Sequence, residues 1–136
     1  MTKKQPSIIF ACVGNSSRSQ MAEAFARKYF PHGTPIVSAG TKPAAKIDPT
    51  TVAAMAEIGI DIYGQKPKLL TTKMLAGATH FISMGCGVLD SCPFPLAKGL
   101  IVEDWGFEDT KGKDIDFIRK VRDEIERRVK AFAKSL

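Results

Sequence analysis

The sequence predicts an α/β fold in which helices cover both faces of a parallel sheet. Runs of apolar residues typical of strands alternate along the chain with segments of helical periodicity, and this alternation is the pattern of βαβ units. The first run, residues 7–13, is almost continuously apolar, as expected of a strand buried on both faces of a parallel sheet. Ligands bind beyond the carboxyl ends of the strands in such sheets, so a site is expected there.

Capping residues and apolar periodicity bound the individual elements. Asp48 followed by Pro49 is typical of the start of a helix, and Gly59 of its end. The last helix is the clearest element, because apolar residues spaced three and four apart form one stripe from Ile118 to Phe132. In chain order we expect a strand at 7–13, a helix at 20–29, a strand at 35–39, helices at 49–58 and 71–75, strands at 79–84 and 99–102, and a helix from about Asp114.

Length and composition are those of one globular domain, expected to span residues 1–136. Apolar residues make up 44% of the chain and charged residues 25%, which excludes extensive disorder. The longest apolar run, residues 8–13, has six residues, far fewer than the roughly 20 that a membrane span needs. The first residues lack the long apolar region of a signal peptide, so the sequence predicts a cytoplasmic protein without a membrane partner.

The net charge is +6, and a basic balance is common among proteins that bind nucleic acids. Most of the excess lies in residues 111–136, where acidic and basic residues are interleaved, as on the solvated face of a helix. Aromatic residues do not alternate with the basic ones. The charge therefore favours attraction of small anions, and we expect no nucleic-acid partner.

The candidate site lies where the first strand ends at Cys12 and Arg18 follows six residues later. Gly14 and Asn15 both tolerate left-handed backbone conformations, so the loop between can curl with its N–H groups inward. The following helix N-terminus and the Arg18 guanidinium add donors that suit a tetrahedral oxyanion. The same donors, with the Ser19 hydroxyl, would stabilise a nucleophilic thiolate, whereas the alternative is an inert core cysteine. The expected oxyanion loop comprises Val13, Gly14, Asn15, Ser16, Ser17, Arg18 and Ser19.

These residues resemble the low-molecular-weight tyrosine phosphatase superfamily, and most closely the arsenate reductases that share its fold. The resemblance rests on Cys12-X5-Arg18-Ser19 and covers nearly the whole chain. It implies a three-layer fold with a four-stranded parallel sheet, and chemistry that needs no metal or organic cofactor. The other matching segments are Gln20-Met21-Ala22-Glu23-Ala24, Ser38-Ala39-Gly40-Thr41, Glu57-Ile58-Gly59-Ile60-Asp61-Ile62, Met84-Gly85-Cys86-Gly87, Asp104-Trp105-Gly106-Phe107-Glu108-Asp109 and Arg122-Asp123-Glu124-Ile125.

Two further cysteines, Cys86 and Cys92, follow the third expected strand. Inert thiols and a zinc site are the alternatives, and the five intervening residues do not suit a structural zinc hairpin. The resemblance implies a thiol relay. Cys12 would attack arsenate, Cys86 would attack Cys12 and release arsenite, and Cys92 would attack Cys86. An external thiol donor such as thioredoxin would then reduce the Cys86–Cys92 disulfide.

The resemblance also implies a general acid, Asp109, where the family has an Asp-Pro pair. In this sequence Thr110 follows, so the stiffening proline is missing, and Asp104 is the alternative acid. The loop departs from the family a second time, because Ser17 stands where many relatives have another cysteine.

A third departure concerns the cation site of potassium-binding relatives. Lys68 stands near the position where those relatives have an acidic residue. Its ammonium group is expected close to Asn15, Glu23 and Ser38, in place of the cation.

The sequence therefore predicts a monomeric arsenate reductase whose partners are an arsenate- or phosphate-like oxyanion and a thiol donor. The three cysteines favour a reductase over a plain phosphatase, which needs only the first. Two alternatives stay open: a low-molecular-weight phosphatase that hydrolyses phosphate monoesters, and a non-catalytic module that binds oxyanions or senses redox state.

Overall fold

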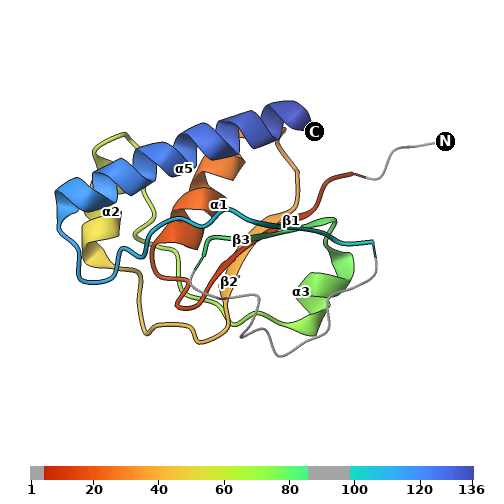
Figure 1. Ribbon diagram of the computed structural model, residues 1–136, viewed down its shortest axis with the longest axis horizontal. Helices are drawn as coiled ribbons and strands as arrows, with labels where there is room; N and C mark the ends of the chain where they lie inside the picture. The colour runs from red at the N-terminus through yellow and green to blue at the C-terminus, as the bar shows by residue number, and fades with distance from the viewer. Residues whose placement is uncertain (1–4, 86–98) are drawn as a thin grey trace.

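The computed structural model describes residues 5–85 and 99–136, and its elements follow the predicted alternation (Figure 1). A strand and a helix alternate through the first half of the chain, and the longest helix closes it. The elements are β1 (Ile8–Cys12), α1 (Arg18–Tyr29), β2 (Ile36–Gly40), α2 (Pro49–Ala56), α3 (Thr72–Gly77), β3 (His80–Ser83), β4 (Ile101–Asp104) and α5 (Ile115–Ser135).

The four strands form one parallel sheet in the order β2-β1-β3-β4. The central strand β1 is paired on both sides, and all five of its residues are buried, which explains its continuous apolar run. Cys12 is its last residue and lies opposite Gly40 of β2. The chain passes from β1 to β2 on one side, and then from β2 to β3 on the other side of β1. The carboxyl end of β1 is therefore the switch point where such sheets bind ligands.

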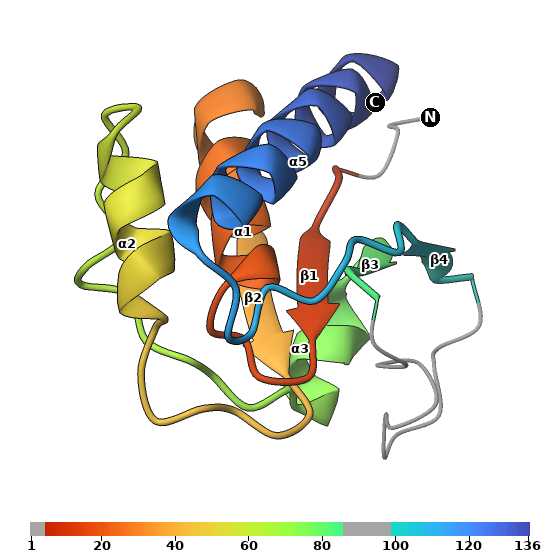
Figure 2. The same cartoon turned by 60° about the vertical axis from the view of Figure 1, so that its left-hand side comes forward.

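Helices cover both faces of this sheet, giving the predicted three layers (Figures 1 and 2). Alternate residues of β1 face opposite layers, as the period of two requires. Phe10 packs in one core with Phe25 of α1 and Ile125 of α5, and Ile9 packs in a second core with Leu75 of α3. The stripe predicted on the last helix is buried at Ile118, Val121, Ile125, Val129 and Phe132, and its last four residues belong to the first core.

The boundaries differ from the predicted ones mainly at the last strand. The sequence predicted it at 99–102, whereas β4 spans Ile101–Asp104. The register is fixed by backbone bonds to β3, where Thr79 O accepts from Ile101 N and Ser83 O accepts from Trp105 N. As an edge strand β4 is largely exposed, with Ile101 50% exposed, so apolar residues did not mark its centre.

Helix α1 begins earlier than the predicted Gln20, at Arg18. The predicted Asp48–Pro49 helix start is confirmed, since the Asp48 carboxylate accepts a hydrogen bond from Thr50 N. No helix among residues 5–85 and 99–136 is long and apolar enough to cross a membrane. Within the same residues, no three His, Cys, Asp or Glu side chains are grouped so as to hold a metal ion.

Candidate active site

The loop between β1 and α1 turns its carbonyl groups towards the segment that follows β2. These carbonyl groups accept three backbone hydrogen bonds, each 2.9 Å long: from Lys42 N to Val13 O, from Ala44 N to Gly14 O and from Asp48 N to Ser16 O. In a trans peptide the N–H of the next residue points opposite to the carbonyl, and the described residues contain no cis peptide bond. The N–H groups of residues 14, 15 and 17 therefore point to the other side of the loop, as the sequence predicted.

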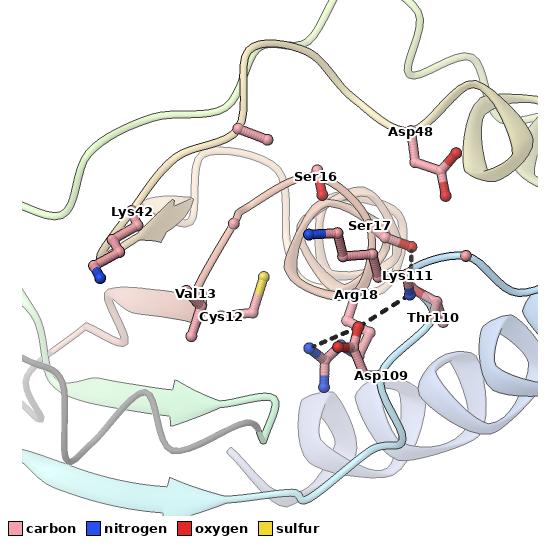
Figure 3. A pocket seen from close by; sticks show the side chains of 13 residues that line it. Cys12, Val13, Ser16, Ser17, Arg18, Lys42, Asp48, Asp109, Thr110 and Lys111 are labelled. Carbon is pink, nitrogen blue, oxygen red and sulfur yellow. Dashed lines mark hydrogen bonds and ion pairs between the residues drawn. The ribbon is translucent and has the colours of Figure 1, made fainter.

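The sulfur of Cys12 lies on that inner side. Cys12 is only 3% exposed, and its Sγ atom accepts a hydrogen bond from Asn15 N at 3.2 Å and lies 2.9 Å from Ser19 Oγ. Figure 3 shows the sulfur pointing into a cavity of about 680 Å³. Both contacts are hydrogen-bond donors of the kind that stabilise a thiolate.

A hydrogen-bond network fixes Asn15, and through it the direction of the Ser19 hydroxyl. Asn15 Oδ1 accepts from Gln20 Nε2 at 3.0 Å and from Lys68 N at 2.8 Å. Its Nδ2 atom consequently faces Ser19 Oγ, to which it donates at 2.8 Å. Ser19 accepts from Asn15, so its own proton is available for the Cys12 sulfur. Asn15 thus braces the loop through both polar atoms of its side-chain amide.

Two residues of the loop tolerate a left-handed backbone conformation, and only one of them adopts it. Asn15 has φ of 50°, whereas Gly14 is not among the described glycines with positive φ. Gly14 therefore does not use its conformational freedom. A Cβ atom at Gly14 would come no closer than 3.4 Å to Ser16 Oγ.

The glycine that the loop does require is Gly40, which the sequence reasoning did not single out. A Cβ atom there would lie 2.5 Å from Val13 O and 3.1 Å from Asn15 N. Gly40 therefore allows the end of β2 to lie directly against the oxyanion loop. A glycine at the end of a strand beside a ligand loop is the sequence signal that could have identified it.

Arg18, the first residue of α1, is buried and held by backbone carbonyls. Its Nη1 atom donates to Phe107 O at 2.8 Å and lies 3.4 Å from Met84 O. Both carbonyls belong to segments that follow neighbouring strands, so the guanidinium joins the loop to β3 and β4. Gly85 passes beside it with φ of 111°, where a Cβ atom would lie 2.9 Å from Phe107 O.

Asp109 lies at the rim of the same cavity (Figure 3). Its Oδ1 atom is 3.6 Å from Arg18 Nη2, and its side chain is 57% exposed. The alternative acid, Asp104, ends β4, accepts a hydrogen bond from Gly106 N, and is not among the described residues that line the cavity. The geometry thus brings Asp109, and not Asp104, to Cys12 and Arg18.

Of the predicted loop residues, Asn15 and Ser19 are not among the described residues that line the cavity, and the others are. Val13, Gly14, Ser16 and Ser17 line it from the loop. Lys42 and Lys111 line it from two other segments and add positive charge near the opening. An anion entering this cavity meets backbone N–H groups, a guanidinium and two ammonium groups.

The predicted surroundings of Lys68 are present behind the loop. Lys68 Nζ lies 3.5 Å from Glu23 Oε1, and the same oxygen accepts from Ser38 N and Ser38 Oγ. Glu23 is buried, and its other oxygen lies 3.3 Å from Arg27 Nε. The ammonium of Lys68 therefore neutralises the buried carboxylate of Glu23, while the backbone N–H of Lys68 holds Asn15.

Two of the predicted catalytic residues, Cys86 and Cys92, lie outside the described residues. Nothing in the described structure bears on the relay they are expected to perform. The described part of the site is the oxyanion loop with Cys12, Arg18 and Asp109.

Comparison with known proteins identifies the family. The family described as low molecular weight phosphotyrosine protein phosphatase matches residues 7–136. This chain therefore belongs to that family, and the resemblance stated from its sequence is confirmed.

Among its curated relatives are arsenate reductases. The arsenate reductase of Brevibacillus brevis is 39% identical over 134 residues, covering 98% of each chain. A solved thioredoxin-dependent arsenate reductase from Corynebacterium glutamicum superposes with a TM-score of 0.81 at 30% identity. That alignment covers 99% of this chain and 63% of the other. An arginine phosphatase from Geobacillus stearothermophilus gives a TM-score of 0.86 at 27% identity, covering 96% and 92%.

Proposed function

We propose that this protein reduces arsenate to arsenite, with Cys12 as the nucleophile. The observation that carries the proposal is the buried Cys12 sulfur, which lies against an N–H group of the loop between β1 and α1 and a hydroxyl group of the first turn of α1. Donors of this kind suit a tetrahedral oxyanion. Arsenate reductases with 39% identity over nearly the full length support the choice of substrate. An inert core cysteine would need neither the inward N–H groups nor the adjacent guanidinium.

In the first step the Cys12 thiolate attacks arsenic and an As–S bond forms. The bond from arsenic to a protonated oxygen breaks, and this hydroxyl group takes a second proton from Asp109 and leaves as water. The loop N–H groups and Arg18 hold the other oxygens, where charge develops. Asp109 is the acid in this proposal because its carboxylate borders the cavity beside Arg18.

The second step is the reduction. The Cys86 thiolate attacks the Cys12 sulfur, a disulfide forms, and the As–S bond breaks with its electron pair passing to arsenic. Arsenic(V) becomes arsenic(III), which leaves as arsenite. The two electrons come from the two thiols, so the step needs no metal or organic cofactor.

The cycle closes by thiol–disulfide exchange. Cys92 attacks Cys86 and frees the Cys12 thiolate, and an external dithiol such as thioredoxin reduces the resulting Cys86–Cys92 disulfide. A thioredoxin-dependent reductase among the solved structures supports this type of reductant. Thiols are kept reduced in the cytoplasm, so we place the protein there. We also propose that it is a monomer.

Hydrolysis of phosphate monoesters is the second candidate function. Phosphate and arsenate are tetrahedral oxyanions of the same charge, and the loop donors suit both. The match to the family described as low molecular weight phosphotyrosine protein phosphatase is the observation that favours it, because phosphotyrosine is a phosphate monoester. A phosphatase would use Cys12, Arg18 and Asp109 but would not need Cys86 or Cys92.

Three proteins distinguish these functions: wild type, Cys12→Ser and Cys92→Ser. Arsenite formation is measured with thioredoxin, thioredoxin reductase and NADPH, and ester hydrolysis with p-nitrophenyl phosphate. We expect Cys12→Ser to lose both activities and Cys92→Ser to lose only sustained arsenate reduction. A wild type that hydrolyses the ester without making arsenite is a phosphatase. A wild type that binds arsenate and performs neither reaction is a binding module.

A further inference from the structure

The residue after Asp109 is anchored to the oxyanion loop by a buried hydrogen bond. The hydroxyl of Thr110 donates to Ser17 Oγ at 2.9 Å, as Figure 3 shows. Thr110 is 2% exposed and Ser17 7% exposed. Ser17 immediately precedes Arg18 and forms the N-cap of α1 without using its side chain as a cap. Its hydroxyl is instead engaged with the segment that carries the acid.

The bond is one link of a chain of hydroxyl groups. Ser17 Oγ lies 2.7 Å from Thr51 Oγ1, which donates to Asp48 Oδ2 at 3.3 Å. Because Thr110 donates to Ser17 and Thr51 donates to Asp48, the one proton of Ser17 is directed to Thr51. The bonds then run in one direction, from Thr110 to a carboxylate at the N-terminus of α2, and each strengthens the next.

Asp109 is exposed, whereas its neighbour Thr110 is buried and bonded to the loop. The Asp109 side chain is 57% exposed, and its described polar contacts are Arg18 Nη2 at 3.6 Å and Lys111 N at 3.0 Å. Residues 105–114 between β4 and α5 contain no helix or strand. An acid on such a segment is effective only when its backbone is held, because a misplacement of about 1 Å can cost about 100-fold in rate. The buried Thr110 holds that backbone one residue from the carboxyl.

We propose that Thr110 is a positioning residue for the acid. Its hydroxyl, bonded to Ser17, fixes residues 109–111 over the oxyanion loop so that the Asp109 carboxyl faces the leaving oxygen. The inference rests on the proposed function, in which Asp109 protonates that oxygen. A purely structural Thr110 would affect stability equally whether or not residue 109 is an acid.

The test is a double-mutant cycle between positions 110 and 109. Thr110→Val keeps the shape of the side chain and removes the hydroxyl, Thr110→Ser keeps the hydroxyl, and Asp109→Asn removes the acid. The rate of the chemical step is measured in a single turnover of saturating arsenate, or of p-nitrophenyl phosphate if the wild type turns over only the ester. Circular dichroism and thermal unfolding check that each variant is folded.

We expect Asp109→Asn to slow the step by about 100-fold and Thr110→Val by about 10-fold, with KM little changed. Thr110→Ser should retain nearly the wild-type rate. In the Asp109→Asn background, Thr110→Val should have almost no further effect, since no acid is left to position. If Thr110→Val does not fold, Ser17→Ala replaces it in the same cycle with the same expectation.

Three results would overturn the inference. If Thr110→Val has the wild-type rate while Asp109→Asn is slow, Thr110 does not position the acid. The proposed function then stands without the inference. Thr110→Val that slows Asp109→Asn as much as it slows wild type shows a structural role. If Asp109→Asn has the wild-type rate, or the wild type turns over neither substrate, the proposed acid or the proposed function fails together with the inference.

Discussion

The sulfur of Cys12 lies 2.9 Å from the hydroxyl oxygen of Ser19, the second residue of α1. Asn15 Nδ2 donates to that oxygen, so the proton of Ser19 is available to the sulfur, and a Cys12 thiolate would accept it. The arrangement connects three parts of one motif: the end of a strand, a left-handed turn residue and the first turn of a helix. In the proposed function, this arrangement prepares Cys12 for nucleophilic attack before any substrate arrives.

Ser19→Ala should therefore make Cys12 less reactive. A hydrogen bond to a charged group contributes about 1.5–3 kcal/mol, so the alkylation rate of Cys12 by iodoacetamide at neutral pH should fall at least about 10-fold. The rate is followed by mass spectrometry of the peptide containing Cys12. Ser135→Ala, the same change at the end of α5, should leave the rate unchanged. Equal alkylation rates in Ser19→Ala and wild type would show that the hydroxyl does not act on the sulfur.

Gly40→Ala should destabilise the protein and disturb the oxyanion loop. The new Cβ atom would lie 2.5 Å from Val13 O, a backbone atom that cannot move without displacing the loop. Overpacking of this kind costs about 1–3 kcal/mol of the free energy of unfolding, measured by urea denaturation. The matched control is Gly64→Ala, where no atom lies within 4 Å of the added carbon. A Gly40→Ala protein as stable and as active as Gly64→Ala contradicts the assignment.

Potassium should not stimulate turnover of the wild type. The ammonium of Lys68 already lies 3.5 Å from Glu23 Oε1, the oxygen that also accepts from Ser38 Oγ. The backbone N–H of Lys68 donates to Asn15 Oδ1. Arsenate turnover should therefore be equal in KCl and NaCl at the same ionic strength. Lys68→Ala should lower turnover and make it respond to potassium, whereas Lys73→Ala on α3 should do neither. A strong rise of wild-type turnover with potassium would exclude this role of Lys68.

The ion pairs between Glu57, which follows α2, and two arginines of α5 should be lost at acidic pH, and their loss should lower the stability of the protein there. Glu57 pairs with Arg119 and Arg122, and the hydrogen bond from Arg119 is the main cause that lowers the pKa of Glu57 from 4.5 to about 2. Since the pKa is lower in the folded protein, the stabilisation is complete above pH 4.5 and is lost as the pH falls towards 2.

The melting temperature of Glu57→Gln should consequently lie below that of wild type at pH 6, and the gap should narrow between pH 4.5 and pH 2. Glu124→Gln is the control, because Glu124 of α5 has no ion pair among the described residues. A gap that stays constant over this range would mean that Glu57 does not titrate as described.

The sequence predicted most of the fold because its signals are local or periodic. The buried strand β1, the Asp48 cap and the apolar stripe of α5 each have a pattern that a short window reveals. The edge strand β4 was displaced by two residues, since an exposed strand takes its register from its neighbour rather than from its own apolar residues.

The part of the site that lies within one motif was also predictable. Cys12, Arg18 and Ser19 are close in the chain, so their spacing already implies a common loop. Gly40, Thr51 and Thr110 could not be found in this way, because each acts through an atom far along the chain. Ser17 and Thr110 were noted separately as departures from the family pattern, and only the fold shows that their hydroxyl groups are bonded to each other.

A single anaerobic turnover without an external reductant would show whether Cys12 begins a thiol relay that reduces arsenate. Reduced protein is mixed with excess arsenate, arsenite is quantified, and the cysteine peptides are mapped by mass spectrometry. We expect about one arsenite per chain, a Cys86–Cys92 disulfide and a free Cys12 thiol, with no arsenite from Cys12→Ser. Absence of arsenite from the wild type, or an equal yield from Cys12→Ser, would contradict the proposed relay.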